Sequence, residues 1–211
     1  MQTLFITATN TDVGKTYTTL QLIKLLSSKG YKVGIYKPIE TGVSTLAPDA
    51  SLLLKACQET NSAFKNLTIK DITAYTFPLP AAPFCADEDG IIEVQHIIEK
   101  HNELSKLCDI LLVEGSGGLM VPITKEYMMI NLIKELNAKT LLVSPSRLGC
   151  INDTLLSMLA LRTFDIEFDW CVNIHEDREN FEKVTKPYYD EVFPNWWSVE
   201  NGLENFTTHL L

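Results

Sequence analysis

The segment TLFITATNTDVGKTYTTLQLIKLLSSKG, residues 3–30, constrains the fold more than any other part of the chain. It begins with an apolar run typical of a buried strand and ends with a helical pattern, and the triplet Gly14-Lys15-Thr16 lies between them. A strand, a glycine turn and a helix in this order are the context of a phosphate-binding loop, because free N–H groups at a helix N-terminus hold anions. The alternative is an ordinary turn that carries an exposed lysine.

The spacing before the triplet departs from the standard loop. The pattern G-x-x-x-x-G-K-[ST] requires a glycine at position 9, which is Thr9, and a loop one residue longer requires it at position 8, which is Ala8. If the loop binds phosphate, Lys15 neutralises the outer phosphates and Thr16 offers its hydroxyl to Mg²⁺. The triplet alone does not decide between a variant phosphate loop and a chance match.

The rest of the chain alternates apolar strand-like runs with helical patterns. We therefore predict a single α/β domain, residues 1–211, with a doubly wound, mostly parallel sheet and helices on both faces. The expected strands are residues 3–9, 32–39, 109–115, 140–146 and 168–175. The expected helices are residues 16–30, 49–57, 94–108, 128–137 and 152–164. Ligands of such sheets bind beyond the carboxyl ends of the strands, so polar residues that come directly after strands are the candidates for a site.

Composition limits the class of partner. The chain has 211 residues, 45% of them apolar, and a net charge of −9, which suits a globular domain and disfavours binding to nucleic acid or to an anionic membrane. The five cysteines form no C-x-x-C pair and are expected to be reduced. No leader and no apolar segment of membrane-spanning length is recognisable, so we expect a cytoplasmic protein that acts on small soluble molecules.

Polar residues lie just after the second and third expected strands. Lys37 and Thr41 lie at the exit of the second strand, where a lysine binds a carboxylate, a carbamate or a phosphate, or simply faces solvent. Asp49 begins the next helix, either as its N-cap or as a metal contact. Glu114 ends the third strand and Gly117 lies in the glycine-rich turn after it, which is a suitable place for an acid that organises Mg²⁺ beside a phosphate loop.

Two further candidates lie near the ends of the last two expected strands. A helix starts near Asn152, and its free N–H groups either hold an anion or are capped within the chain. Asn173 ends the fifth strand, where an amide either reads the edge of a base or caps a turn. By position alone, capping is the simpler explanation for Asn152.

Taken together, these segments resemble the dethiobiotin synthetase family. Residues 8–16 resemble its lengthened loop, G-T-D-T-x-V-G-K-T, with Ala8 in place of glycine and Asn10 in place of Asp. The segments KPIETG, PDASLLL, VEGSGGLMVPI and RLGCIN are similar to further family motifs and occur in the family's order. The resemblance covers residues 3 to about 175. Asn131 stands where relatives often have Asp, and the C-terminus lacks the P-x-L-G segment that helps to enclose the base in relatives.

The resemblance implies an ATP-dependent cyclo-ligase that converts 7,8-diaminononanoate, CO₂ and ATP to dethiobiotin, ADP and phosphate, with Mg²⁺ as cofactor. The residues implied for nucleotide binding are Asp12, Val13, Gly14, Lys15, Thr16, Tyr17, Glu114, Gly117 and Asn173. Those implied for the diamine and its carbamate are Thr11, Lys37, Thr41, Gly149, Cys150 and Asn152. Those implied for Mg²⁺ are Thr16, Asp49 and Glu114, and those implied for catalysis are Lys15, Lys37 and Thr11. In relatives the helix that starts near Gly149 belongs to the partner subunit, which implies a homodimer.

Three other functions share parts of this pattern. A nucleotide-switched ATPase of the partitioning or maturation type has a lysine early in its loop, and that position is Asn10 here. A cobyrinate-type amidation enzyme needs an attached glutaminase domain, for which 211 residues leave no room. A degenerate binding protein would keep the fold without turnover.

Overall fold

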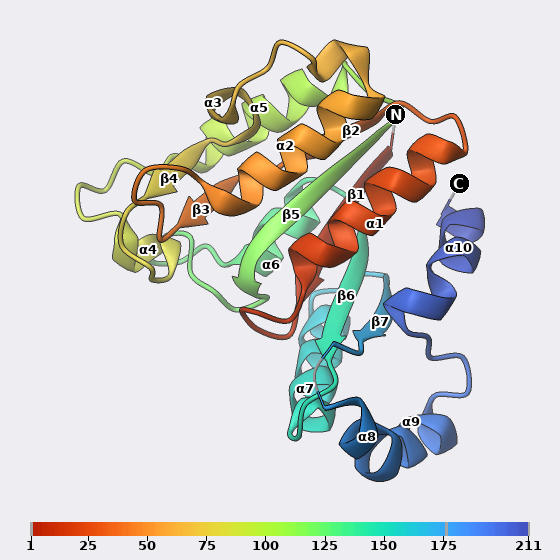
Figure 1. The fold of residues 1–211 in the computed structure, drawn as a ribbon. Helices are drawn as coiled ribbons and strands as arrows, with labels where there is room; N and C mark the ends of the chain where they lie inside the picture. Colours follow the sequence, from red (N-terminus) through yellow and green to blue (C-terminus); the bar gives the residue numbers. More distant parts are fainter. Residues whose placement is uncertain (1, 176, 211) are drawn as a thin grey trace.

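The computed structural model describes residues 2–175 and 177–210, and its centre is a five-stranded sheet (Figure 1). The strand order is β2-β5-β1-β6-β7, and every neighbouring pair is parallel. The strands are β1 (Gln2–Ala8), β2 (Val33–Tyr36), β5 (Ile110–Gly118), β6 (Lys139–Pro145) and β7 (Phe168–Asn173). The inner strands are apolar on both faces, because helices cover both sides of a parallel sheet.

Helices lie on both faces of this sheet, as predicted. Figure 1 shows α1 and α2 in front of the sheet and α6 and α7 behind it. The main helices are α1 (Lys15–Ser28), α2 (Pro48–Thr60), α5 (Val94–Ser105), α6 (Met129–Glu135), α7 (Cys150–Thr163) and α10 (Val199–Leu210). The predicted doubly wound α/β architecture is therefore confirmed. Within the described part of the chain, no helix combines the length and the apolar character needed to cross a bilayer.

The prediction of the second strand was wrong in one respect. Residues 32–39 do not form a single strand, because the chain leaves the main sheet after Tyr36. β2 ends at Tyr36, and β3 (Ile39–Thr41) pairs instead with β4 (Tyr75–Phe77) in a separate parallel sheet. Pro38 has no N–H group and cannot continue the ladder, and its carbonyl oxygen accepts a hydrogen bond from the N–H of Ala74 at 2.9 Å. This departure places Lys37 at the rim of the main sheet.

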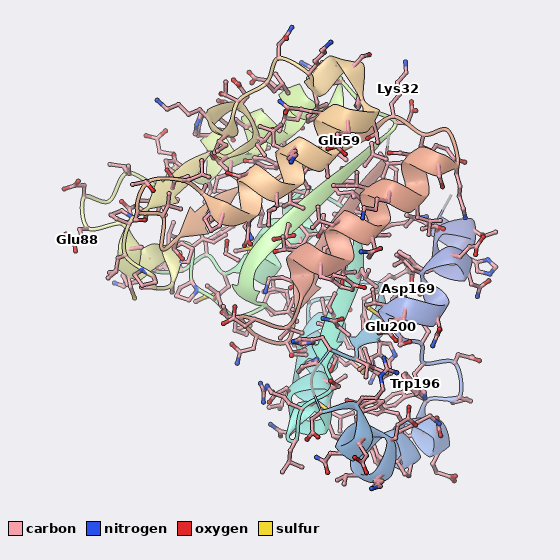
Figure 2. The ribbon with its side chains drawn as sticks, viewed as in Figure 1. Lys32, Glu59, Glu88, Asp169, Trp196 and Glu200 are labelled. Carbon is pink, nitrogen blue, oxygen red and sulfur yellow. The ribbon has the colours of Figure 1, made fainter. Side chains whose placement is uncertain are left out.

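Several short elements were not predicted from the sequence. They are a 3₁₀ turn (Ser62–Phe64), α3 (Ile69–Ile72), α4 (Pro83–Ala86), α8 (Arg178–Asn180), a π-helical turn (Phe181–Thr185) and α9 (Lys186–Val192). The loop between α4 and α5 is peripheral, and Glu88 at its tip points away from the sheet (Figure 2). Each of these elements is too short for helical periodicity to be recognised in the sequence.

The C-terminal segment closes the edge of the sheet at β7. The N–H of Val172 donates to the carbonyl of Trp197, and α10 then returns to lie near α1. Trp197 stacks on Phe206 with ring centroids 5.3 Å apart, and Trp196, labelled in Figure 2, packs edge-on against Phe181. The two tryptophans therefore contribute to packing.

Candidate active site

The loop between β1 and α1 explains why the chain tolerates Ala8. Ala8 is the last residue of β1, in extended backbone, and it pairs with Gly118 and Val143. An extended residue does not need a glycine. The left-handed positions of the loop are Asp12, with φ of 56°, and Gly14, with φ of 98°, which precedes the first residue of α1.

Gly14 is required at its position for a second reason. A Cβ added there would lie 1.9 Å from Nδ2 of Asn173, which is far inside van der Waals contact. Asn173 is buried at the end of β7, and its Nδ2 donates to the carbonyl of Val13 at 3.0 Å. The last residue of β7 therefore holds the loop in place through this hydrogen bond.

Lys15 folds back over the loop that precedes it. Its Nζ donates to the backbone carbonyl of Asn10 at 2.9 Å, and only 7% of the residue is exposed. Since the contact uses the backbone, the change from Asp to Asn at position 10 leaves it intact. Burial, and secondarily the charge of Lys37, lower the pKa of Lys15 to about 8, against the pull of Glu114 in the other direction.

Beneath the loop, Glu114 is fully buried and its carboxylate is hydrogen-bonded on both oxygens. Oε1 accepts from Thr16 Oγ1 at 3.0 Å and from Lys37 Nζ at 2.8 Å. Oε2 accepts from Thr19 Oγ1 at 2.8 Å. Glu114 lies in the middle of β5 and links this strand to α1 and to the rim of β2, and a buried carboxylate needs such partners to be tolerated.

Lys37 joins this acid to a second one. Its Nζ lies 2.8 Å from Glu114 and 3.2 Å from Oδ2 of Asp49, and it is only 3% exposed, whereas Asp49 is 40% exposed. Burial alone would lower the pKa of Lys37, but the two carboxylates outweigh it and raise that pKa above its ordinary value. The two carboxylates therefore favour the charged form of this buried ammonium group.

Glu40 belongs to the same cluster and was missed in the sequence. It is 4% exposed, and its two oxygens accept the backbone N–H groups of Asp49 at 2.8 Å and Ala50 at 2.9 Å. Burial raises the pKa of Glu40 in spite of these bonds. No local capping pattern reveals the contact, because the acid lies nine residues before the first N–H that it caps.

These residues surround a cavity of about 690 Å³, which is within the usual size range of ligand clefts. The predicted residues that line it are Thr11, Asp12, Gly14, Lys15, Thr16, Lys37, Thr41, Asp49 and Gly117. The lining residues that were not predicted are Glu40, Pro80, Ala81, Ala82, Pro83, Ser116, Val121 and His175. Of these, Glu40 and Ser116 come directly after expected strands and His175 ends one, so the rule of strand ends could have found all three.

The other predicted residues lie outside the cavity. Val13 is buried in the core, and Tyr17 is 45% exposed on α1. The start of α7 lies apart: the buried Cys150 Sγ accepts a hydrogen bond from the hydroxyl of Tyr189 at 3.7 Å, while Asn152 faces solvent. The predicted roles of Gly149, Cys150 and Asn152 therefore require a ligand that reaches them from outside this cavity.

The donor set beneath the loop and at the start of α2 fits a hard divalent cation. Thr16 offers a hydroxyl, and Asp49 and Glu114 offer carboxylate oxygens, which are the ligands that Mg²⁺ prefers. Over residues 2–175 and 177–210, no group of three or more His, Cys, Asp or Glu side chains is placed to hold a metal by itself. A cation here would therefore share its shell with water or with phosphate oxygens.

A parallel sheet, a Gly-Lys-Thr turn opening a helix and a carboxylate under that turn define a P-loop nucleotide-binding protein. A family model described as an AAA domain matches residues 2–185. The ATP-dependent dethiobiotin synthetase BioD of Sulfurovum sp. is 60% identical over 210 residues, which span the whole of both chains. The protein of the same name from Wolinella succinogenes is 37% identical over 100% of this chain and 99% of its own. The chain belongs to the dethiobiotin synthetase family.

Solved structures resemble this one in fold. A MinC:MinD cell division protein complex from Aquifex aeolicus matches with a TM-score of 0.57 and 18% identity, over 100% of this chain and 86% of the other. A plasmid partition protein from Borrelia burgdorferi matches with a TM-score of 0.60 and 11% identity, over 99% and 98%. At these identities the likeness establishes the shared fold alone.

Proposed function

We propose that this chain is an ATP-dependent dethiobiotin synthetase, which joins CO₂ to the two amines of 7,8-diaminononanoate and releases dethiobiotin, ADP and phosphate. The observation that carries the proposal is the buried Lys37, held charged beside the phosphate loop in a cavity that Lys15 also lines. A switch ATPase needs a phosphate loop but has no evident use for a second buried cation with an open cavity beside it. The named relative with 60% identity supports the same reaction.

The reaction brings several anions together, and the cavity offers the charges to hold them. One amine captures CO₂ as a carbamate, a carbamate oxygen attacks the γ-phosphorus, and the second amine then closes the ring and expels phosphate. In our proposal Lys15 and the N–H groups of the loop stabilise the transferred phosphoryl group. Lys37 holds the carbamate and the phosphoryl oxygens, and Thr11 and Thr41 position the diamine.

Mg²⁺ would be held by Thr16, Asp49 and Glu114, directly or through water, and when bound it supplies positive charge to the phosphate oxygens. The apolar wall formed by residues 80–83 and Val121 suits the aliphatic chain of the substrate, which carries no polar group between its amines and its carboxylate. The charged side of the cavity would therefore hold the reacting amines and phosphate, and the apolar side would hold the aliphatic chain of the substrate.

The function is tested by measuring phosphate release with Mg-ATP and bicarbonate, with and without 7,8-diaminononanoate. We expect release that depends on the diamine and equals the dethiobiotin formed. Release that is indifferent to the diamine would instead indicate a switch ATPase, and no release would indicate a binding protein without turnover. Repeating the assay with GTP and CTP measures base selectivity, since the chain lacks the P-x-L-G segment.

We propose in addition that the protein acts as a homodimer through α7. The outer face of α7 and the turn before it expose the apolar side chains of Leu148, Leu155, Leu156 and Leu159. Several exposed leucines on one helix and the turn before it are typical of a surface buried by a partner. Pairing through α7 would also bring the N–H groups near Gly149 and Asn152 to the partner's cavity, where the distant carboxylate of the substrate needs a site.

Leu156→Glu is expected to separate the dimer and to lower turnover with it. An unpaired carboxylate in an apolar interface costs about 3 kcal/mol or more, which raises the dimer dissociation constant about 100-fold. Sedimentation velocity measures the change, and Leu52→Glu, at an exposed leucine on α2, is the matched control. A wild-type protein that is monomeric and fully active at assay concentration contradicts the dimer proposal and leaves the reaction itself untouched.

A further inference from the structure

We infer that Glu40 is a positioning residue for the cation site, because its carboxylate fixes the start of α2 and thereby the residue Asp49. The inference rests on the proposed function, since it concerns the site at which Mg²⁺ would be held. Glu40 is not among the site residues assigned from the motifs.

The N-terminus of α2 depends on Glu40 for its hydrogen bonds. A helix leaves its first four N–H groups without partners inside the helix. At α2 the first residue is Pro48, which has no N–H, and the N–H of Ser51 donates to the carbonyl of Ala47 at 3.0 Å. The two N–H groups between them, on Asp49 and Ala50, both donate to Glu40. The local N-cap, Ala47, has no side chain that could replace it.

The same contact sets the position of Asp49. The carboxylate of Asp49 lies 3.2 Å from Lys37 Nζ, and the backbone N–H of the same residue is held by Glu40. Because Asp49 is 40% exposed, packing restrains its side chain only weakly. A series of polar contacts therefore connects Glu40 through Asp49 and Lys37 to Glu114. At one end of this series Glu40 is hydrogen-bonded to two backbone N–H groups of α2.

Mutation of a carboxylate that orients a metal ligand without binding the metal itself typically changes metal affinity by about 10–100-fold. In Glu40→Ala the two N–H groups of α2 lose their acceptor, and Asp49 is no longer held against Lys37. Glu40→Gln keeps one acceptor oxygen but turns an amide N–H₂ toward the other donor. We expect the affinity for the cation to fall in the order wild type, Glu40→Gln, Glu40→Ala.

The experiment measures Mn²⁺ binding by electron paramagnetic resonance in the presence of a non-hydrolysable ATP analogue. We expect the dissociation constant to rise about 10–100-fold in Glu40→Ala and by a smaller factor in Glu40→Gln. Hydrogen exchange of the Asp49 and Ala50 amides is the second readout, and it should quicken in both variants. The matched control is Asp71→Asn, which removes a helix-capping carboxylate outside the cavity, bonded to the N–H and hydroxyl of Thr68.

Three outcomes would overturn the inference. Faster exchange with unchanged Mn²⁺ affinity would confine Glu40 to a structural role, and unchanged exchange would show that it does not hold α2. If Asp71→Asn lowers Mn²⁺ affinity equally, the effect is one of general stability. The Mn²⁺ measurement needs only the nucleotide analogue, so it stays readable even if phosphate release proves independent of the diamine and the proposed function fails.

Discussion

Lys37→Ala is expected to lower turnover by about 10²–10³-fold, the usual cost of removing one group that stabilises developing charge in an active site. In the proposed mechanism this lysine holds the carbamate and the transferred phosphoryl group, and among the described residues no other lysine or arginine lines the cavity apart from Lys15. Phosphate release with saturating ATP and diamine measures the change. Lys55→Ala, at an exposed lysine on α2, is the control and should be silent.

The same variant is expected to lose stability, which the motif alone did not indicate. Glu114 is fully buried, and without Lys37 it keeps only the hydroxyl donors of Thr16 and Thr19. Breaking a buried ion pair from one side typically costs about 3–5 kcal/mol of unfolding free energy. Urea denaturation at neutral pH measures this loss. A variant that keeps both wild-type turnover and wild-type stability would rule out the assignment of Lys37.

Gly14→Ala is expected to abolish tight nucleotide binding and to destabilise the fold. The left-handed backbone costs a residue with a Cβ about 1–2 kcal/mol, and overpacking against Asn173 adds about 1–3 kcal/mol. Gly30 supplies a matched control, because its φ of 90° is similar but a Cβ there meets no atom within 4 Å. Gly30→Ala should therefore show the backbone cost alone, with normal ATP affinity by calorimetry.

A double variant identifies the cause of the Gly14 effect. Gly14→Ala with Asn173→Ala removes the side chain that the new methyl group would overlap, so the two substitutions should cost less together than the sum of the single changes. Additive losses would mean that strain in the loop, and not contact with Asn173, makes Gly14 necessary. The role of Asn173 in reading the base stays a prediction.

The main strands and the polar residues at their ends could be predicted from the sequence, and the reason is physical. The main strands are buried on both faces, so their apolar runs stand out, and a parallel sheet brings the residues at the carboxyl ends of its strands to one edge. Lys15, Lys37 and Glu114 were found in this way, and the structure places them together. Family membership was predicted from the order of the motifs and is confirmed.

The features that could not be predicted depend on contacts between distant segments. The departure of the chain from the main sheet at Pro38 was missed because the run KVGIYKPI is largely apolar. Only the pairing of β3 with β4 shows where β2 ends. The capping role of Glu40 carries no local signal, since the helix that it caps begins after an intervening loop. Whether α7 completes the cavity of a partner depends on a second chain and stays a proposal.

The strand order has a consequence for how the chain reaches its native state. β1 precedes the other four strands of the main sheet in the sequence, yet it lies in the middle of that sheet, where Leu4 pairs with Leu112 on one side and with Lys139 on the other. Non-local pairing of this kind slows folding, because a long loop must close before any contact is gained. During translation the apolar β1 therefore stays without its pairing partners until β5 and β6 have left the ribosome. The phosphate loop, which follows β1, therefore takes its final shape only after these strands are available to pair.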